Sequence, residues 1–122
     1  MIYFYPKDNT PGCTTEGLDF KTSFRKFRSR NTQVIGVSRD SLVSHDKFRI
    51  KHGFPFHLVS DPDEKLCKLF GVIKMKNMYG KKVRGIERST FLIDEKGYLR
   101  KEWRKVKVRD HVTSVLNAID IL

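Results

Sequence analysis

The segment FYPKDNTPGC, residues 4–13, leads from an aromatic strand into a loop interrupted by proline. The loop delivers Cys13 to the start of a helix expected over about residues 14–30. That helix carries one apolar stripe at i, i+4 and i+7, formed by Phe20, Phe24 and Phe27. At a helix N-terminus, free backbone N–H groups and the positive end of the helix dipole favour a thiolate, the reactive form of cysteine. We therefore expect sulfur chemistry at Cys13.

The length of the chain indicates a single domain over residues 1–122, large enough to bury about 65% of its unfolded surface. Its two cysteines, Cys13 and Cys67, lie far apart and do not resemble a secreted disulfide framework, which favours a reducing compartment and a cytoplasmic location. No apolar run approaches the roughly 20 residues of a membrane span, and the first residues do not follow a signal-peptide pattern.

The chain is strongly basic, with a net charge of +11 from 25 basic and 14 acidic residues. Such a balance favours attraction to nucleic acid, anionic membranes or acidic partners. The densest tracts are Lys74–Arg84 and Arg100–Arg109, and the second contains Trp103, an arrangement that suits single-stranded nucleic acid. Because strand residues alternate between two faces, we expect Trp103 to pack inward. We interpret the charge as a solvated surface and expect neither nucleic acid nor a membrane as partner.

Strand and helix patterns alternate along the chain without a repeat or linker. Strands are expected at Met1–Tyr5, Gln33–Val37 and His57–Val59, and a helix from Ser41 to about His52 before Gly53 and Pro55.

A helix start is predicted at Asp61-Pro62-Asp63-Glu64, with Asp61 as N-cap, Pro62 at the first helical position and Glu64 as the reciprocal capping residue. This helix is expected to direct three apolar side chains inward and to end at Gly71. They are Leu66, Leu69 and Phe70.

The last third of the chain predicts an exposed loop over residues 74–85, then a β-hairpin of Thr90–Asp94 and Tyr98–Trp103. A final helix carries a stripe of Val112, Val115, Leu116 and Ile119. The order β-α-β-α-β-α-β-β-α requires parallel early strands and an antiparallel final one. It predicts an α/β protein with a mixed central sheet flanked by helices on both faces, which is the plan of a thioredoxin-like fold.

The motifs of the chain resemble those of the peroxiredoxins. Pro6, Thr10 and Cys13 match the signature Pro-x-x-x-Thr-x-x-Cys, and YFYPKDNTPGCTTE (3–16) is similar to the Q-type, or bacterioferritin comigratory protein, subfamily. The similarity continues in order and spacing through four further stretches: VIGVSRD (34–40), FRIKHGFPFHLVSD (48–61), KLFGV (68–72) and RSTFLID (88–94). It covers essentially the whole chain.

This resemblance implies a thiol-dependent peroxidase in which Cys13 is the peroxidatic nucleophile. Its thiolate attacks hydrogen peroxide or an alkyl hydroperoxide and becomes a sulfenic acid. Thr10 is expected to hydrogen-bond the sulfur or the peroxide, and the N–H groups of Gly12 and Cys13 to point at the same place. Pro6 is expected to shield the sulfur from bulk water.

Arg88 matches the site arginine of the family, a fixed cation that favours the thiolate and orients the peroxide. Glu16 is expected to hold Arg88, since a carboxylate one turn into the helix lies on the same face as Cys13, and the alternative is a simple capping or dipole role. No bound cofactor is implied. No metal site is expected either, because the histidines lack metal-ligand spacing: His45, His52, His57 and His111.

Regeneration of the sulfur depends on a second thiol. Many members of the subfamily place a resolving cysteine at the position that Leu18 occupies here. Cys67 is interpreted as a core residue, with the alternative that it resolves the sulfenic acid. A one-cysteine enzyme needs an outside thiol, such as thioredoxin, glutaredoxin or glutathione.

Peroxiredoxins of this group usually carry an N-terminal hairpin before this point, whereas here Met1 takes the place of a strand residue. We expect an uncovered apolar surface or sheet edge, in a monomer or weak dimer. Two other functions stay open. One is a thiol–disulfide exchanger of the same fold, against which the lack of a CxxC pair counts; the other is a basic nucleic-acid-binding module with a lapsed peroxidase site.

Overall fold

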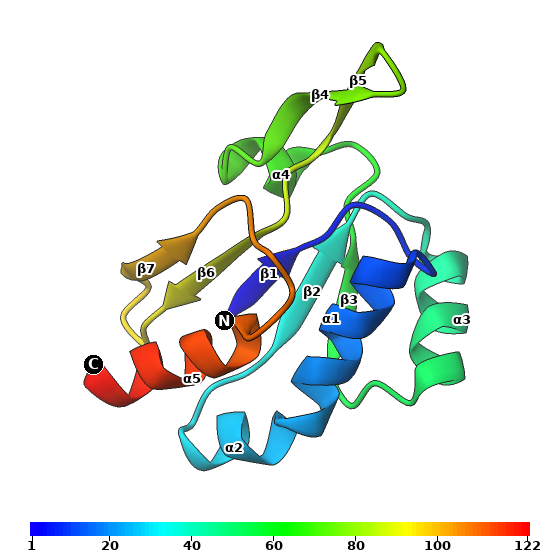
Figure 1. Cartoon of the computed structure of the whole chain (residues 1–122). Helices are drawn as coiled ribbons and strands as arrows, with labels where there is room; N and C mark the ends of the chain where they lie inside the picture. The colour runs from blue at the N-terminus through cyan, green and yellow to red at the C-terminus, as the bar shows by residue number, and fades with distance from the viewer.

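Helices and strands alternate along residues 1–122, all of which the computed structural model describes (Figure 1). In chain order they are β1 (Ile2–Phe4), α1 (Pro11–Thr22), α2 (Phe24–Ser29), β2 (Ile35–Ser38), α3 (Leu42–His52), β3 (His57–Ser60), α4 (Lys65–Leu69), β4 (Ile73–Met78), β5 (Lys81–Ile86), β6 (Ser89–Ile93), β7 (Leu99–Trp103) and α5 (His111–Ile121). None of the helices has the length and apolar character needed to cross a membrane.

A five-stranded sheet in the order β3-β2-β1-β6-β7 forms the centre of the molecule. β1 pairs parallel with β2 and β2 with β3, whereas β6 pairs antiparallel with both β1 and β7. Parallel neighbours need a crossover connection, and α1 with α2, and then α3, supply the two that are required here. The predicted mixed sheet and its final antiparallel hairpin are confirmed.

Alternation along the first strand divides the core into two clusters. Tyr3 and Tyr5 face the larger cluster, where the Tyr3 ring lies 4.6 Å from that of Phe20, and where α1, α2, α3 and α5 all contribute side chains. Phe4 points to the opposite face and packs in a smaller cluster with Cys67 of α4. Each fully buried aromatic side chain contributes roughly 1.5–3 kcal/mol. The prediction of helices on both faces is confirmed, although α4 is the one helix that contributes to the second cluster.

The first helix differs from the expected single helix over 14–30. It begins earlier, at Pro11, because proline suits the first helical position, where its missing N–H has no partner to lose. It is interrupted at Ser23, whose backbone leaves helical geometry at φ −97° and ψ 8°. Hydroxyl side chains compete for backbone hydrogen bonds, which makes Thr22-Ser23 a weak point in a helix.

The start predicted for α4 is partly wrong. The Asp61 carboxylate does accept backbone N–H bonds from Leu66 (3.2 Å) and Cys67 (2.8 Å), as an N-cap would. However, Glu64 adopts a left-handed conformation with φ 61°, so the helix begins only at Lys65. The Glu64 side chain makes ion pairs with arginines instead of capping the helix.

One side chain of α4 also lies outside its expected place. Leu69 is 78% exposed, whereas Leu66 and Phe70 pack against the smaller cluster as predicted. Cys67 is the most deeply buried residue of α4, and Leu69, two positions further along the helix, points to the opposite side.

The loop expected over residues 74–85 is in fact the antiparallel hairpin β4–β5. Its pairing runs from Ile73 opposite Ile86 to Met78 opposite Lys81. Tyr79 and Gly80 connect the strands, both with positive φ (51° and 78°), which matches the twist that a two-residue hairpin turn requires. High lysine and glycine content hid the strand pattern. The hairpin projects beyond the body of the molecule (Figure 1).

Candidate active site

Cys13 lies in the first turn of α1, as the sequence predicts. The first hydrogen bond of the helix runs from the Thr14 N–H to the Thr10 carbonyl (2.9 Å), so the N–H groups of Gly12 and Cys13 precede the helical ladder. The cysteine is only 2% exposed and belongs to the larger core cluster. In this conformation the sulfur is therefore more accessible to a small peroxide than to a bulky reactant.

Arg88, between β5 and β6, joins the sulfur to a carboxylate. Its Nη2 lies 3.4 Å from the Cys13 Sγ, and its Nη1 donates to Glu16 Oε1 at 2.7 Å. Glu16 follows Cys13 by three residues on α1, so both side chains lie on one face of the helix. The structure therefore brings together the nucleophile, cation and supporting carboxylate named from the sequence.

Glu16 is fully buried, and its second oxygen, Oε2, has no hydrogen-bond partner. Burial raises the pKa of its carboxyl to about 7, against the opposing effect of the Arg88 guanidinium. The charge of this carboxylate therefore changes near neutral pH. The contact with Arg88 favours the holding role over a simple capping role.

Three residues before Cys13 are also predicted from the sequence to belong to this site. The Thr10 hydroxyl donates to the Lys7 carbonyl at 2.7 Å, which uses its single hydrogen, so toward a substrate the oxygen acts as an acceptor. A Cβ on Gly12 would lie 3.1 Å from Arg88 Nη2, so glycine leaves room for the guanidinium. Pro6 is half-buried in the loop between β1 and α1.

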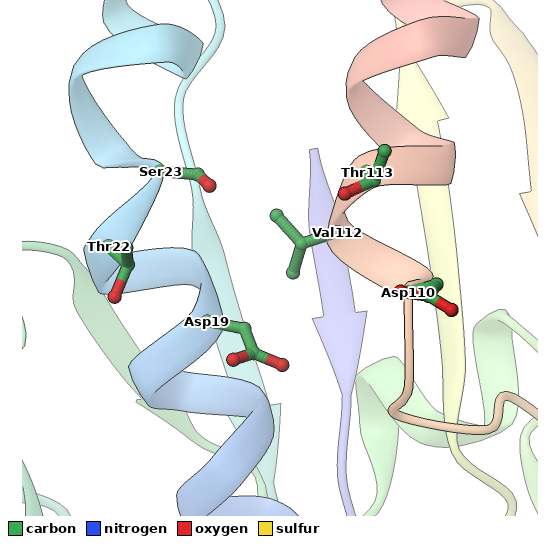
Figure 2. A pocket seen from close by; sticks show the side chains of 6 residues that line it. All are labelled: Asp19, Thr22, Ser23, Asp110, Val112 and Thr113. Carbon is green, nitrogen blue, oxygen red and sulfur yellow. The ribbon is translucent and has the colours of Figure 1, made fainter.

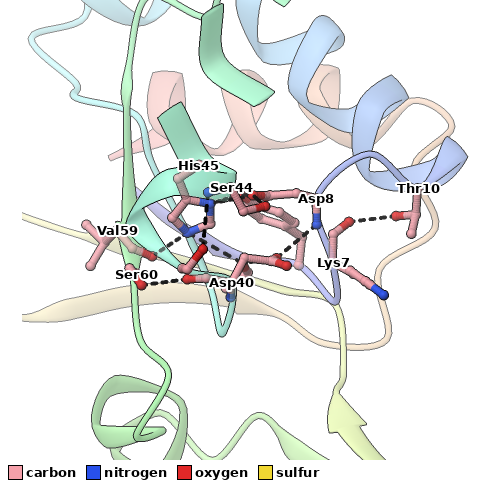
Figure 3. A network of polar contacts seen from close by, with 11 residues as sticks. Lys7, Asp8, Thr10, Asp40, Ser44, His45, Val59 and Ser60 are labelled. Atoms are coloured by element: carbon pink, nitrogen blue, oxygen red, sulfur yellow. Dashed lines mark hydrogen bonds and ion pairs between the residues drawn. The ribbon is translucent and has the colours of Figure 1, made fainter. Parts of the chain in front are cut away.

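Beneath this loop lies a buried polar network that the sequence did not reveal (Figure 3). Asp8 accepts hydrogen bonds from Tyr5 (2.7 Å) and Ser44 (2.8 Å), and its carboxylate lies 2.8 Å from His45 Nδ1. His45 Nε2 lies 3.1 Å from the Val59 carbonyl, which can only accept. Both ring nitrogens therefore carry hydrogen, and the imidazolium ties the loop to α3 and β3.

The pKa values of this pair agree with its geometry. Burial opposes the charge on His45, but the hydrogen bond and negative charge of Asp8 outweigh it and raise the pKa of the imidazole. Burial likewise opposes charge on Asp8, and donors from His45, Tyr5 and Ser44 lower its pKa overall. His45 is thus a structural core residue.

The same network contains the side chains best placed for a metal ion. Ligand-type atoms of Asp8, Asp40 and His45 all lie within 4.8 Å of one another. Asp40 Oδ2, however, accepts from the Ser38 hydroxyl (2.6 Å) and from the Asp8 backbone N–H (2.9 Å), and both nitrogens of His45 are engaged. These internal partners make the arrangement a hydrogen-bond network that fixes the loop, and it does not fit a metal.

Cys67 lies in a different part of the core from Cys13. It is completely buried in the smaller cluster, on the opposite face of the sheet from the cluster that holds Cys13. Burial, and then a hydrogen bond to Asp61, raises the pKa of its thiol to about 12. A thiol that stays protonated is a poor nucleophile. Leu18, at the resolving position of many relatives, is partly exposed.

A shallow polar groove of about 220 Å³ lies between α1 and α5 (Figure 2). Its lining consists of Asp19, Thr22, Ser23, Asp110, Val112 and Thr113. None of these side chains is a thiol or a cation, so the groove lacks the groups that sulfur chemistry needs.

Comparison with known proteins places the chain in a family. The model of the AhpC/TSA family matches residues 1–102. The chain belongs to the AhpC/TSA family. It is 60% identical to peroxiredoxin Bcp of Xanthomonas campestris over 119 residues, which are 98% of this chain and 74% of that protein. Peroxiredoxin Bcp of Bacillus subtilis is 54% identical, with 98% of this chain and 76% of that protein covered.

Solved structures of other family members show the same fold. A bacterioferritin comigratory protein of Xanthomonas campestris, studied for its alkyl peroxide reduction activity, superposes with a TM-score of 0.93 at 58% identity, covering 98% of this chain and 76% of that one. Peroxidoxin BcpB of Mycobacterium tuberculosis gives 0.87 at 26% identity, covering 99% and 77%. The predicted thioredoxin-like fold and peroxiredoxin resemblance are confirmed, and the chain is a thiol-dependent peroxidase.

Proposed function

We propose that Cys13 is the peroxidatic cysteine and reduces both hydrogen peroxide and alkyl hydroperoxides. Its thiolate attacks one peroxide oxygen, the O–O bond breaks, and the leaving oxygen takes a proton to become water or an alcohol. Cys13 is left as a sulfenic acid. The observation that carries this proposal is the Arg88 guanidinium, 3.4 Å from the sulfur and anchored on buried Glu16. The alkyl peroxide activity of the Xanthomonas campestris relative supports the wider substrate range.

Each neighbouring group has a distinct part in that step. Negative charge moves onto the leaving oxygen, and the Arg88 fork and the free N–H groups at the start of α1 stabilise it there. Thr10, already donating to Lys7, accepts the hydrogen of the bound peroxide. Glu16 acts as a positioning residue for Arg88, Gly12 provides the space, and Pro6 keeps bulk water from the sulfur.

The pH dependence of the reaction tests the role of Glu16. Below pH of about 7 its carboxyl takes up a proton, and the charge interaction with Arg88 is lost. We expect the rate of Cys13 oxidation in wild type to fall roughly ten- to hundredfold on this account. Glu16→Gln should lack this fall in rate and should be oxidised at the rate of low-pH wild type at every pH. Rapid-quench oxidation rates between pH 5 and about pH 9 measure it.

A stability measurement separates this role from a structural one. The pKa of Glu16 is higher in the folded than in the unfolded protein, so the folded protein binds more protons between about pH 4 and about pH 7. Its unfolding free energy therefore falls as the pH rises through that interval. Glu16→Gln should remove that slope in denaturant titrations. Identical pH profiles for the variant and wild type in both experiments would exclude Glu16 from the site.

For regeneration we propose a one-cysteine mechanism in a reducing compartment such as the cytoplasm, with the enzyme as a monomer or weak dimer. The protonated, buried state of Cys67 supports an outside thiol from thioredoxin, glutaredoxin or glutathione. That thiol attacks the sulfenic sulfur, water leaves, and a mixed disulfide with Cys13 forms.

Mass spectrometry after one equivalent of peroxide tests this mechanism. Wild type and Cys67→Ser should both gain about 16 Da, the mass of one oxygen, and Cys67→Ser should keep its full first turnover. A loss of about 2 Da in wild type alone would instead show a disulfide between Cys13 and Cys67. That result would replace the one-cysteine mechanism without removing the peroxidase activity.

A further inference from the structure

The β4–β5 hairpin concentrates positive charge on an exposed element. Residues 73–86 contain five of the 25 basic residues and no acidic residue. Of these cations, Lys74, Lys81 and Lys82 are exposed and make no ion pair with a carboxylate. The hairpin therefore presents charge to solvent that the protein does not neutralise itself.

Apolar side chains lie among these lysines. Tyr79 at the tip is 100% exposed, and Met75, Met78 and Val83 are exposed by 62%, 53% and 42%. Methionine is adaptable and polarisable, and tyrosine provides a large apolar ring with a polar end, properties that suit contact with another protein. The hairpin therefore presents apolar contact area together with its positive charge.

The base of the hairpin adjoins the active site. β5 ends at Ile86, two residues before Arg88, and the Lys76 ammonium donates to the Ile86 carbonyl. Burial lowers the pKa of Lys76, and the positive charge of Arg88 lowers it further, in keeping with an ammonium close to the site. Arg84 of β5 pairs with Glu64, which also binds Arg39 at 3.1 Å, so the hairpin is fastened to the body at this end.

We propose that the β4–β5 hairpin is the docking surface for an acidic dithiol protein that reduces oxidised Cys13. The inference rests on the proposed one-cysteine function. An unneutralised cationic surface attracts an acidic partner over about one Debye length, about 10 Å at 0.1 M salt, and raises its association rate. Exposed methionine and tyrosine side chains then provide the apolar contact area. Because the base of the hairpin leads directly into Arg88, a reductant bound to the hairpin lies next to the segment that contacts Cys13.

The chemistry of this partner needs two thiols. The first, as thiolate, attacks the sulfenic sulfur of Cys13, and its S–S bond forms as the S–O bond breaks and hydroxide leaves as water with one added proton. The second thiolate of the partner then attacks the partner's own sulfur in the mixed disulfide. Cys13 is released as thiolate, and the partner leaves as an intramolecular disulfide.

Charge reversal at the hairpin tests the proposal. The variant Lys81→Glu/Lys82→Glu changes two exposed side chains, and neither of them contacts Cys13. The matched control, Arg25→Glu/Lys26→Glu, makes the same change in net charge on exposed positions of α2, which lies at the other end of the molecule (Figure 1). Peroxide turnover is measured with a thioredoxin of acidic isoelectric point, and separately with dithiothreitol, a small neutral dithiol.

We expect the hairpin variant to lose about tenfold or more in kcat/KM for thioredoxin at low salt, with the loss shrinking at high salt, and the control to lose far less. Turnover with dithiothreitol should equal that of wild type in both variants. Equal thioredoxin kinetics in the hairpin variant and the control would overturn the docking proposal. If, in addition, wild type and the control retain an oligonucleotide and the hairpin variant does not, the surface would be assigned to nucleic acid. Failure of wild type with dithiothreitol would instead refute the proposed function.

Discussion

Cys13→Ser will reduce peroxide consumption to the background rate, a loss on the order of a thousandfold or more. A serine hydroxyl is not ionised near neutral pH and is a much weaker nucleophile than a thiolate, so the O–O bond has no attacking group. The substitution keeps the size of the side chain in a site that is only 2% exposed, so the fold should persist. Peroxide loss in the presence of dithiothreitol measures the effect.

Cys67→Ser is the matched control for that experiment, because it removes a thiol of the same size from the other core cluster. It should retain the first turnover, and thermal unfolding of both variants shows whether each is folded. Substantial peroxide consumption by folded Cys13→Ser would show that Cys13 is not the reacting sulfur. Loss of peroxide consumption in folded Cys67→Ser would contradict the assignment as well.

Arg88→Ala should slow oxidation of Cys13 by about 100- to 1000-fold, equivalent to about 2.7–4 kcal/mol of lost transition-state stabilisation. The alanine removes the donors that face the sulfur and the leaving oxygen. It also leaves Glu16 buried without its partner, so we expect the unfolding free energy to fall as well. Rates of a single oxidation at several peroxide concentrations separate the chemical effect from the loss of stability.

Arg88→Lys provides the comparison, since lysine keeps the positive charge but not the planar fork that bonds sulfur and carboxylate together. A rate between those of wild type and Arg88→Ala is expected. Oxidation of Arg88→Ala at the wild-type rate, in protein shown to be folded, would remove Arg88 from the site.

The contact between Arg88 and Cys13 shows how far the sequence alone could lead. Local signals, a proline at the first helical position and free N–H groups, are enough to place Cys13. Arg88 is distant in the chain, and only the family resemblance singled it out. Its position depends on the antiparallel pairing of β1 with β6, which sets Phe4 opposite Ser89 and brings the adjacent arginine beside the loop that leaves β1.

Features that depend on tertiary contacts could not be predicted from local sequence patterns. The Asp61-Pro62 motif predicts a helix start, but two arginines hold Glu64 in a left-handed conformation that delays it. His45 shows no spacing that distinguishes it, because its partners come from the loop between β1 and α1 and from β3. The β4–β5 hairpin has too many lysines to read as strands, since most of its side chains face water and need no apolar alternation.

The separation of the two thiols by the sheet has a consequence for the lifetime of the enzyme. In the proposed one-cysteine mechanism no sulfur within the chain caps oxidised Cys13, so a donor from outside competes directly with a second peroxide molecule. If the peroxide arrives first, the sulfur becomes sulfinic acid, a state that ordinary thiols do not reverse. The fraction of molecules inactivated in this way therefore follows the ratio of oxidant to available electron donor, and falls as donor becomes plentiful.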